Sequence, residues 1–187
     1  SLMERCQVSS IACPSWFMSC GKISEVKQGR HRGLRIMGTE YETIYAFGGL
    51  CMVNSIEEII YLNDLCDRLG MDTISAGNLA AFAIEASKSK KIKDNLHYGE
   101  VDGIAEILTK IAYRKGVGRI LSEGVRHAAK VWEMEEEAIH VKGLEPAGFD
   151  PRVLKGRGLA YATSDRGACH LRATFYKSEL SGQIDPN

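Results

Sequence analysis

The chain has 187 residues, of which 44% are hydrophobic, and its 24 Lys and Arg residues balance 24 Asp and Glu residues. This length and composition allow one ordinary domain, or one and a half small ones, with a sizeable core. The formal net charge of zero gives no argument for a nucleic acid or an anionic membrane as partner. No apolar run approaches the length of a membrane span, and the start lacks a signal-peptide pattern.

The chain begins with Ser1 rather than methionine and stops at Asn187 without a terminal helix pattern. We therefore expect it to be a piece of a larger protein. Its six cysteines do not predict a disulfide scaffold, because the chain is long and rich in core residues. Cys51 and Cys66 lie on apolar segments, and we expect them to be small buried hydrophobes.

Residues 1–38 have the least helical pattern. Cys13 is followed by Pro14, which breaks a helix, and two loosely alternating segments then flank a Gly-rich turn. The pattern predicts a cysteine-bearing loop followed by a short β-hairpin near residues 22–37.

From Thr39 the pattern becomes helical. Thr39 is a candidate N-cap for a helix that extends to about residue 50. Glu42 falls in the first turn of this helix, where a carboxylate suits the positive helix end. Two interpretations of Glu42 stay open: it is only a partner of the helix dipole, or it is a buried carboxylate with a raised pKa.

A second helix is predicted at residues 55–70, because Ser55 and Glu58 have the form of a capping box. Gly70 lies where a chain leaves a helix in the left-handed conformation, which costs glycine no Cβ clash. Asp72 then stands at the N-cap position of a third helix, to about residue 87.

This junction places Asp67 and Asp72 close together. By itself it is explained by two packed helices with ordinary caps, or by a ligand site built on carboxylates. Gly77, inside the third helix, costs up to about 1 kcal/mol relative to alanine, which predicts a close helix contact or a bound ligand there.

Two more helices are predicted, one capped by Asp102 and one at residues 120–132. The chain is therefore predicted to be mainly α and multihelical, with a short hairpin near residues 22–37 and either a short strand or an extended connector at residues 138–142. By its pattern the chain divides into a cysteine-bearing loop and hairpin (1–38), a helical part (39–142) and a last part (143–187). The last part begins with a Gly- and Pro-rich stretch, typical of a junction or a substrate-facing loop.

Two further sets of residues have side chains that can bind a metal cluster or transfer protons. Three cysteines spaced C-x2-C-x3-C would hold an iron–sulfur cluster, but Trp16 occupies the middle position between Cys13 and Cys20, which leaves a cluster or ordinary thiols as alternatives. The histidine side chain in general titrates near neutrality, so His170 is interpreted either as a proton donor and acceptor or as a surface or capping histidine.

Three segments resemble the C-terminal helical region of tungsten- or molybdenum-containing aldehyde ferredoxin oxidoreductases. Residues 38–44 (GTEYETI) are similar to the family's Pro-Glu-Tyr-Glu-Thr segment. Residues 63–75 (NDLCDRLGMDTIS) are similar to its Asn-x-x-Cys-Asp-x-Leu-Gly-Leu-Asp-Thr-Ile-Ser segment. Residues 158–170 (GLAYATSDRGACH) are similarly close.

The resemblance implies that residues 39–142 are a helical cofactor-contacting domain and that residues 143–187 are the truncated start of a further C-terminal domain. It also implies a site. Asp67, Met71 and Asp72 would contact a tungsten- or molybdenum-bis-molybdopterin, with Met71 in place of the family's leucine. Glu42 and His170 would assist hydration or proton transfer while an aldehyde becomes a carboxylic acid. Electrons would pass through the pterin to a [4Fe–4S] cluster and then to ferredoxin, in the cytoplasm.

Two departures from the family shape these expectations. Trp16 cannot ligate iron, and the family's N-terminal sheet domain and second pterin motif are absent from these residues. We expect the piece alone to bind no cofactor, to be inactive without the remaining domains of its chain, and to self-associate through uncovered apolar surface. The alternatives are a pterin-binding or interaction subunit that has lost its cluster, and a helical domain that only resembles the enzyme.

Overall fold

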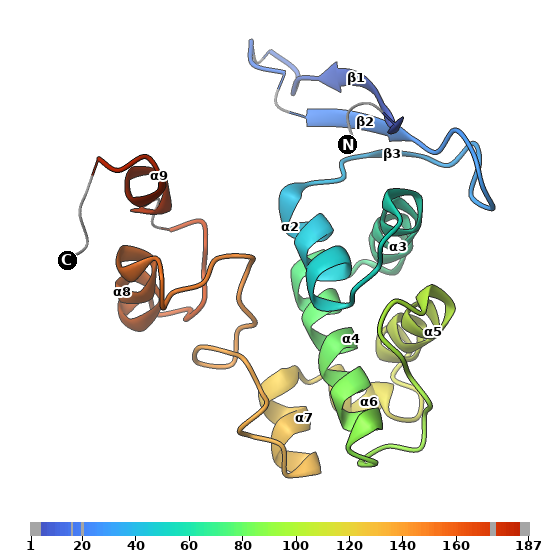
Figure 1. The fold of residues 1–187 in the computed structure, drawn as a ribbon, viewed down its shortest axis with the longest axis vertical. Coiled ribbons are helices and arrows are strands. Elements are labelled where there is room, and N and C mark those ends of the chain that lie inside the picture. Colours follow the sequence, from blue (N-terminus) through green and yellow to red (C-terminus); the bar gives the residue numbers. More distant parts are fainter. Residues whose placement is uncertain (1–4, 16, 20, 173–174, 184–187) are drawn as a thin grey trace.

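The computed structural model describes residues 5–15, 17–19, 21–172 and 175–183, and it is mainly helical with one small sheet (Figure 1). The sheet has three antiparallel strands in the order β1-β2-β3, at Gln7–Ile11, Gly21–Glu25 and Arg35–Met37. The β2–β3 hairpin, with Ile23 opposite Met37, confirms the predicted hairpin. Strand β1, which the sequence did not predict, covers the free edge of β2.

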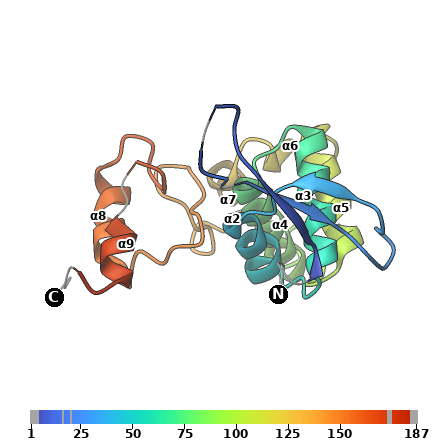
Figure 2. The same ribbon diagram turned by 90° about the horizontal axis from the view of Figure 1, so that it is seen from above.

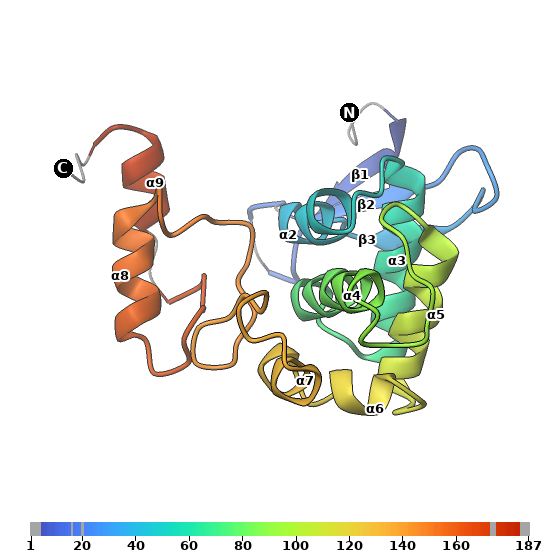
Figure 3. The same ribbon diagram turned by 60° about the horizontal axis from the view of Figure 1, so that its bottom comes forward.

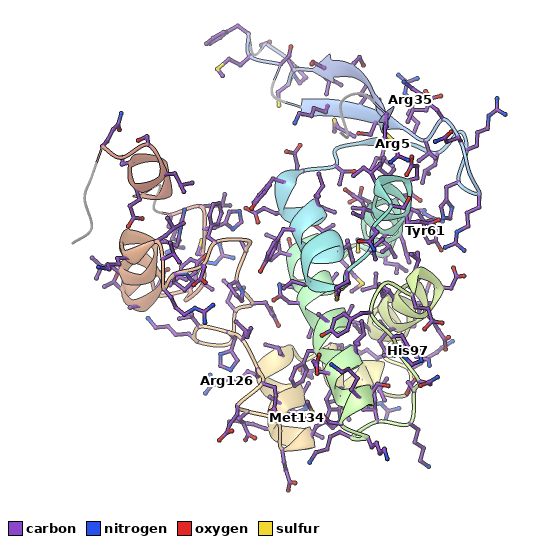
Figure 4. The ribbon with its side chains drawn as sticks, in the orientation of Figure 1. Arg5, Arg35, Tyr61, His97, Arg126 and Met134 are labelled. Carbon is purple, nitrogen blue, oxygen red and sulfur yellow. The ribbon has the colours of Figure 1, made fainter. Side chains whose placement is uncertain are left out.

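The turn of the hairpin is fixed to the helices by an ion-pair network. The guanidinium of Arg30 donates to both carboxylate oxygens of Glu58, at 2.8–3.2 Å, and to those of Asp102, at 2.7 and 3.0 Å. The His31 ring stacks on Tyr61 with a centroid distance of 4.1 Å. Figure 4 shows Tyr61 on α3, below the sheet.

This network corrects the predicted capping box. Glu58 binds Arg30 and His31, and the hydroxyl of Ser55 donates to Glu57 at 2.8 Å. The Arg30 guanidinium gives Glu58 several bonds from a charged donor, whereas the capping box would give it only one bond from a backbone N–H. Helix α3 therefore begins after Ser55 without a side-chain cap.

The ion-pair network should make the stability of the folded protein depend on pH. Hydrogen bonding from Arg30, followed by that from His31, outweighs burial and lowers the pKa of Glu58. Its stabilisation is thus present near neutrality and is lost as the pH falls below about 4. Arg30→Ala should cost about 1 kcal/mol at neutral pH and less near pH 4, measured by urea unfolding. Arg32→Ala is the control, because Arg32 forms no ion pair with the described residues; equal losses in both variants would contradict the prediction.

Eight helices and one π-helix, η1, follow in the described residues. Their bounds are α2 Tyr41–Thr43, η1 Ile44–Leu50, α3 Ile56–Leu69, α4 Thr73–Lys88, α5 Val101–Ala112, α6 Gly118–Leu121, α7 Val125–Trp132, α8 Lys155–Thr163 and α9 Phe175–Leu180. Helix α4 is central and contacts α2, η1, α3, α5 and α7 (Figure 3). Cys51 and Cys66 are fully buried in this core, as predicted, and burial raises the pKa of each thiol to about 12.

Three helix boundaries differ from the prediction. Thr39 is no cap: it is buried, Glu40 is extended, and α2 begins at Tyr41. Asp102 lies inside α5 and pairs with Arg30, because the helix already begins at Val101. The helix predicted at 120–132 is two helices, separated by Gly124 at φ +90°.

The C-terminal helices α8 and α9 pack on each other and lie to one side of the helical body (Figure 2). Helix α8 arises from a stretch that its glycines and prolines had predicted to be a loop. None of the helices in the described ranges is long and apolar enough to cross a membrane. The division of the chain at residues 38 and 142 stays a prediction.

Candidate functional site

The junction between α3 and α4 is formed by two helix caps. Gly70, at φ +68°, ends α3, and the Met71 N–H donates to the carbonyl of Cys66 at 2.9 Å. The Asp72 carboxylate accepts a bond of 2.8 Å from the Ser75 N–H and caps α4. Both caps are as the sequence predicted, because each depends on one residue type in one local backbone conformation.

The junction forms one wall of a cleft of about 330 Å³. Asp67, Met71 and Asp72 line this cleft, and so does Glu42 from α2. The fold thus brings the three candidate cofactor-binding residues together with one candidate catalytic residue. The remaining lining residues are Met37, Gly38, Glu40, Thr43, Asn63, Thr73 and Ile74.

The cleft is rich in hydrogen-bond acceptors. Its lining contains the carboxylates of Glu40, Glu42, Asp67 and Asp72 and, among the described residues, no Lys or Arg. Burial, together with the nearby Asp64, raises the pKa of Asp67. Carboxylates and backbone carbonyls accept hydrogen bonds. This set of acceptors therefore fits the N–H edge of a pterin ring and disfavours an anionic group.

Helix α2, which carries Glu42, and helix α4, which Asp72 caps, are tied together next to the cleft. The hydroxyls of Thr43 on α2 and Thr73 on α4 lie 2.8 Å apart. Further along, a Cβ on Gly77 would lie 2.5 Å from the Cβ of Ala46 in η1. Of the two reasons predicted for this glycine, the structure shows the close helix contact, which holds η1 against α4.

His170 lines a second cavity, of about 310 Å³, that shares Asp72 and Ile74 with the first cleft. The other residues of this cavity are Ser75, Leu144, Glu145, Arg166, Ala168, Cys169 and Leu171. The two candidate catalytic residues therefore lie on neighbouring cavities rather than in direct contact.

One segment connects these two residues. The Gly148 N–H donates to Glu42 Oε2 at 2.9 Å. The ring of the next residue, Phe149, stacks on the His170 ring with a centroid distance of 6.4 Å, and it lies 6.4 Å from the Tyr41 ring. The segment at 145–149 thus contacts Glu42 at one point and His170 at the next.

The cysteine ligands of an iron–sulfur cluster are not brought together in the described residues. Cys13 is exposed, and no group of three or more His, Cys, Asp or Glu side chains among the described residues is placed to hold a metal ion. Trp16 and Cys20 lie outside the described residues. Cys13 and Cys20 as cluster ligands therefore stay a prediction, and no electron-transfer step is derived through a cluster.

The sequence did not single out several residues of the site. Asn63 was only one position of a helical pattern, yet its side chain donates to Asp67 at 2.9 Å. Glu145, Gly148 and Phe149 belong to the stretch interpreted as a junction or a substrate-facing loop. A lone glutamate in a Gly- and Pro-rich segment was the available signal, since a carboxylate without a neighbouring cation needs specific donors if it is buried.

Comparison with known proteins shows which family the chain is similar to. All of it, residues 1–187, matches the family described as "Aldehyde ferredoxin oxidoreductase, domains 2 & 3". It is 34% identical to the tungsten-containing aldehyde ferredoxin oxidoreductases of Pyrococcus furiosus and Thermococcus kodakarensis, over 94% of this chain. It is 31% identical to an aliphatic sulfonate oxidoreductase, WOR-like subunit, of Pyrococcus furiosus, over 90% of this chain.

The chain spans 30% of the length of the two tungsten-containing relatives and 29% of the sulfonate oxidoreductase subunit. A solved structure, the active site complex BamBC of benzoyl coenzyme A reductase with 1,5-dienoyl-CoA, has the same fold. Its TM-score is 0.70 at 22% identity, over 88% of this chain and 26% of the other. With the family match over its full length, the chain belongs to the aldehyde ferredoxin oxidoreductase family.

Proposed function

We propose that the protein containing this chain oxidises an aldehyde to a carboxylic acid, at a tungsten- or molybdenum-bis-molybdopterin, and passes the electrons to ferredoxin. The observation that carries the proposal is the acceptor-rich cleft at the α3–α4 junction, with Glu42 in its wall. The relatives named tungsten-containing aldehyde ferredoxin oxidoreductases support the chemistry. Their names supply the metal, the substrate class and the electron acceptor.

Asp67 and Asp72 would hold the pterin by accepting hydrogen bonds from its ring N–H groups, with Met71 beside them. When bound, the cofactor would take up the two electrons that the aldehyde and a water molecule release as they become a carboxylic acid and two protons. The capping bond from Ser75 fixes the Asp72 carboxylate at the cleft. The bond from Asn63 fixes that of Asp67 in the same way.

Glu42 and His170 would move the protons. Gly148 N–H fixes Glu42 Oε2, and within the described part of the chain Oε1 makes no hydrogen bond. That free oxygen is suited to accept a proton from a water molecule or an aldehyde hydrate in the cleft. His170, on the neighbouring cavity, would accept or donate the second proton.

The isolated chain is proposed to bind no cofactor and to be inactive, because it spans only 30% of the length of the tungsten-containing relatives and the remaining domains would complete the site. Cytoplasmic location and self-association of the isolated piece belong to the same proposal. Metal analysis of the isolated chain tests it. Stoichiometric tungsten, molybdenum or iron would contradict it.

A second candidate function is a pterin-binding or interaction subunit that has lost its cluster. Trp16, between Cys13 and Cys20, favours this candidate. The visible absorption spectrum of the full-length protein distinguishes the two. An iron–sulfur band that bleaches on adding aldehyde supports the enzyme, and its absence from a tungsten-loaded protein supports the subunit.

The cofactor site is tested by removing its carboxylates in the full-length protein. Asp67→Ala combined with Asp72→Ser should lower bound tungsten at least about tenfold, because the acceptors for the pterin are lost. Serine retains an N-cap for α4, which limits the loss of stability. The control is Asp64→Ala on the same helix, where Asp64 pairs with Arg68.

Tungsten is measured by inductively coupled plasma mass spectrometry on purified protein. Parental tungsten in the double variant would exclude the cleft as the pterin site and leave the third interpretation, a helical domain that only resembles the enzyme. Loss of tungsten in the Asp64 control as well would show a general folding defect.

A further inference from the structure

Glu145 is a buried carboxylate, 6% exposed, on the segment between α7 and α8. Its Oε1 accepts a bond of 2.9 Å from the Val125 N–H, and its Oε2 accepts one of 3.0 Å from the Ser75 hydroxyl. Val125 is the first residue of α7, so the helix itself leaves this N–H without a partner. The negative charge also lies at the positive end of the helix dipole.

The residues after Glu145 are held at two further points. Asn78 on α4 donates to the carbonyl of Pro146 at 3.2 Å, and the Gly148 N–H donates to Glu42. A Cβ on Gly148 would lie 2.7 Å from the ring of Tyr45, so the backbone passes close to η1. The segment is thus attached to α7, α4 and α2 within four residues.

Phe149 connects the segment at 145–149 to His170. Its ring stacks on the His170 ring, and the Arg157 guanidinium lies 4.9 Å from the Phe149 ring centroid. Arg157 also donates to the His170 carbonyl at 2.9 Å. A shift of the segment would therefore move both the bond to Glu42 and the ring against His170.

Ser75 links this segment to the cofactor cleft. Its N–H donates to Asp72, and its hydroxyl donates to Glu145. One serine on α4 thus joins the N-cap at the cleft to the anchor of the segment that contacts both proton-moving residues.

We propose that Glu145 is a positioning residue, which sets the relative placement of Glu42 and His170 through residues 145–149. This rests on the proposed function, in which those two groups move protons. A buried carboxylate held by two donors anchors a loop because its removal leaves both donors unpaired. A misplacement of about 1 Å at a catalytic group can cost about 100-fold in rate.

The test compares Glu145→Ala with Glu145→Gln in the full-length protein. Glutamine keeps an oxygen for the Val125 N–H, and its amide can donate to the Ser75 hydroxyl. Hydrogen–deuterium exchange with mass spectrometry should show the Val125 and Gly148 amides exchanging about tenfold faster in the alanine variant. In the glutamine variant, exchange should stay within about threefold of the parent.

The second readout is the rate of aldehyde oxidation per bound tungsten. In Glu145→Ala, kcat per tungsten should fall at least about tenfold with little change in KM, and in Glu145→Gln it should change less than about threefold. A merely structural role would lower the melting temperature and the tungsten content but leave kcat per tungsten unchanged. If Glu145→Ala does not accumulate, Ser75→Ala replaces it, since that change removes only the bond to Oε2.

Two results would overturn the inference: unchanged exchange at Gly148 in the alanine variant, or faster exchange there with an unchanged kcat per tungsten. An inactive parental protein would instead refute the proposed function. The two failures are distinguishable, because exchange at Val125 and Gly148 is measured without any turnover.

Discussion

Replacing Gly77 by alanine is expected to destabilise the protein by about 2–3 kcal/mol, although alanine favours a helix over glycine by about 1 kcal/mol. The added Cβ would lie 2.5 Å from the Ala46 Cβ and 2.9 Å from its carbonyl carbon. The obstacle includes backbone, so no flexible side chain can move aside. Either α4 separates from η1 or the helix distorts, and both change the cleft between Glu42 and Asp72.

Urea unfolding of the full-length protein measures this loss, with Gly103→Ala on α5 as the control. A Cβ on Gly103 would meet only side chains, the nearest at 3.4 Å, so that variant should be neutral or up to about 1 kcal/mol more stable. A stabilised Gly77→Ala variant would show that the contact between η1 and α4 is loose.

Replacing Glu42 by glutamine is expected to lower kcat of the full-length protein by about 100-fold or more, without loss of tungsten. Glutamine keeps an oxygen for the Gly148 N–H but cannot accept a proton at neutral pH. The loss of a positioned general base typically costs about 10²–10⁴ in rate. The cleft volume and the fold should be retained, because the two side chains have nearly the same shape.

Steady-state kinetics normalised to bound tungsten measures the effect. Glu106→Gln is the control, because this carboxylate lies on α5 and pairs with Lys110. If the Glu42→Gln variant retains more than about a third of the parental kcat, Glu42 does not transfer a proton in the reaction. Parallel loss of tungsten and rate would give Glu42 a role in holding the cofactor.

The sequence predicted the features that depend on few neighbours. Gly70 and Asp72 form the expected caps because one backbone conformation and one side-chain bond decide each of them. The hairpin was predictable because its two strands are adjacent in the chain. Asp67 and Asp72 line the same cleft because the caps of this junction fix where both residues lie.

The features that the sequence did not predict depend on partners far along the chain. Glu58 binds Arg30, 28 residues away, instead of forming the predicted capping box. Glu145 found its donors 20 and 70 residues away, at Val125 and Ser75. Local patterns carry no information about such partners. Neither the ion-pair network of Arg30 nor the anchoring of residues 145–149 by Glu145 could therefore be predicted from the sequence.

The wide turn of η1 affects how relatives should be aligned. At its C-terminal end the N–H of Cys51 donates to the carbonyl of Ala46, five residues back, at 3.3 Å. A π-turn accommodates one residue more than an α-turn of the same length. A homologue with a regular helix here would thus need one residue fewer between Glu42 and Cys51 to keep both in place. Such a difference would appear as a single-residue gap at the contact with Gly77.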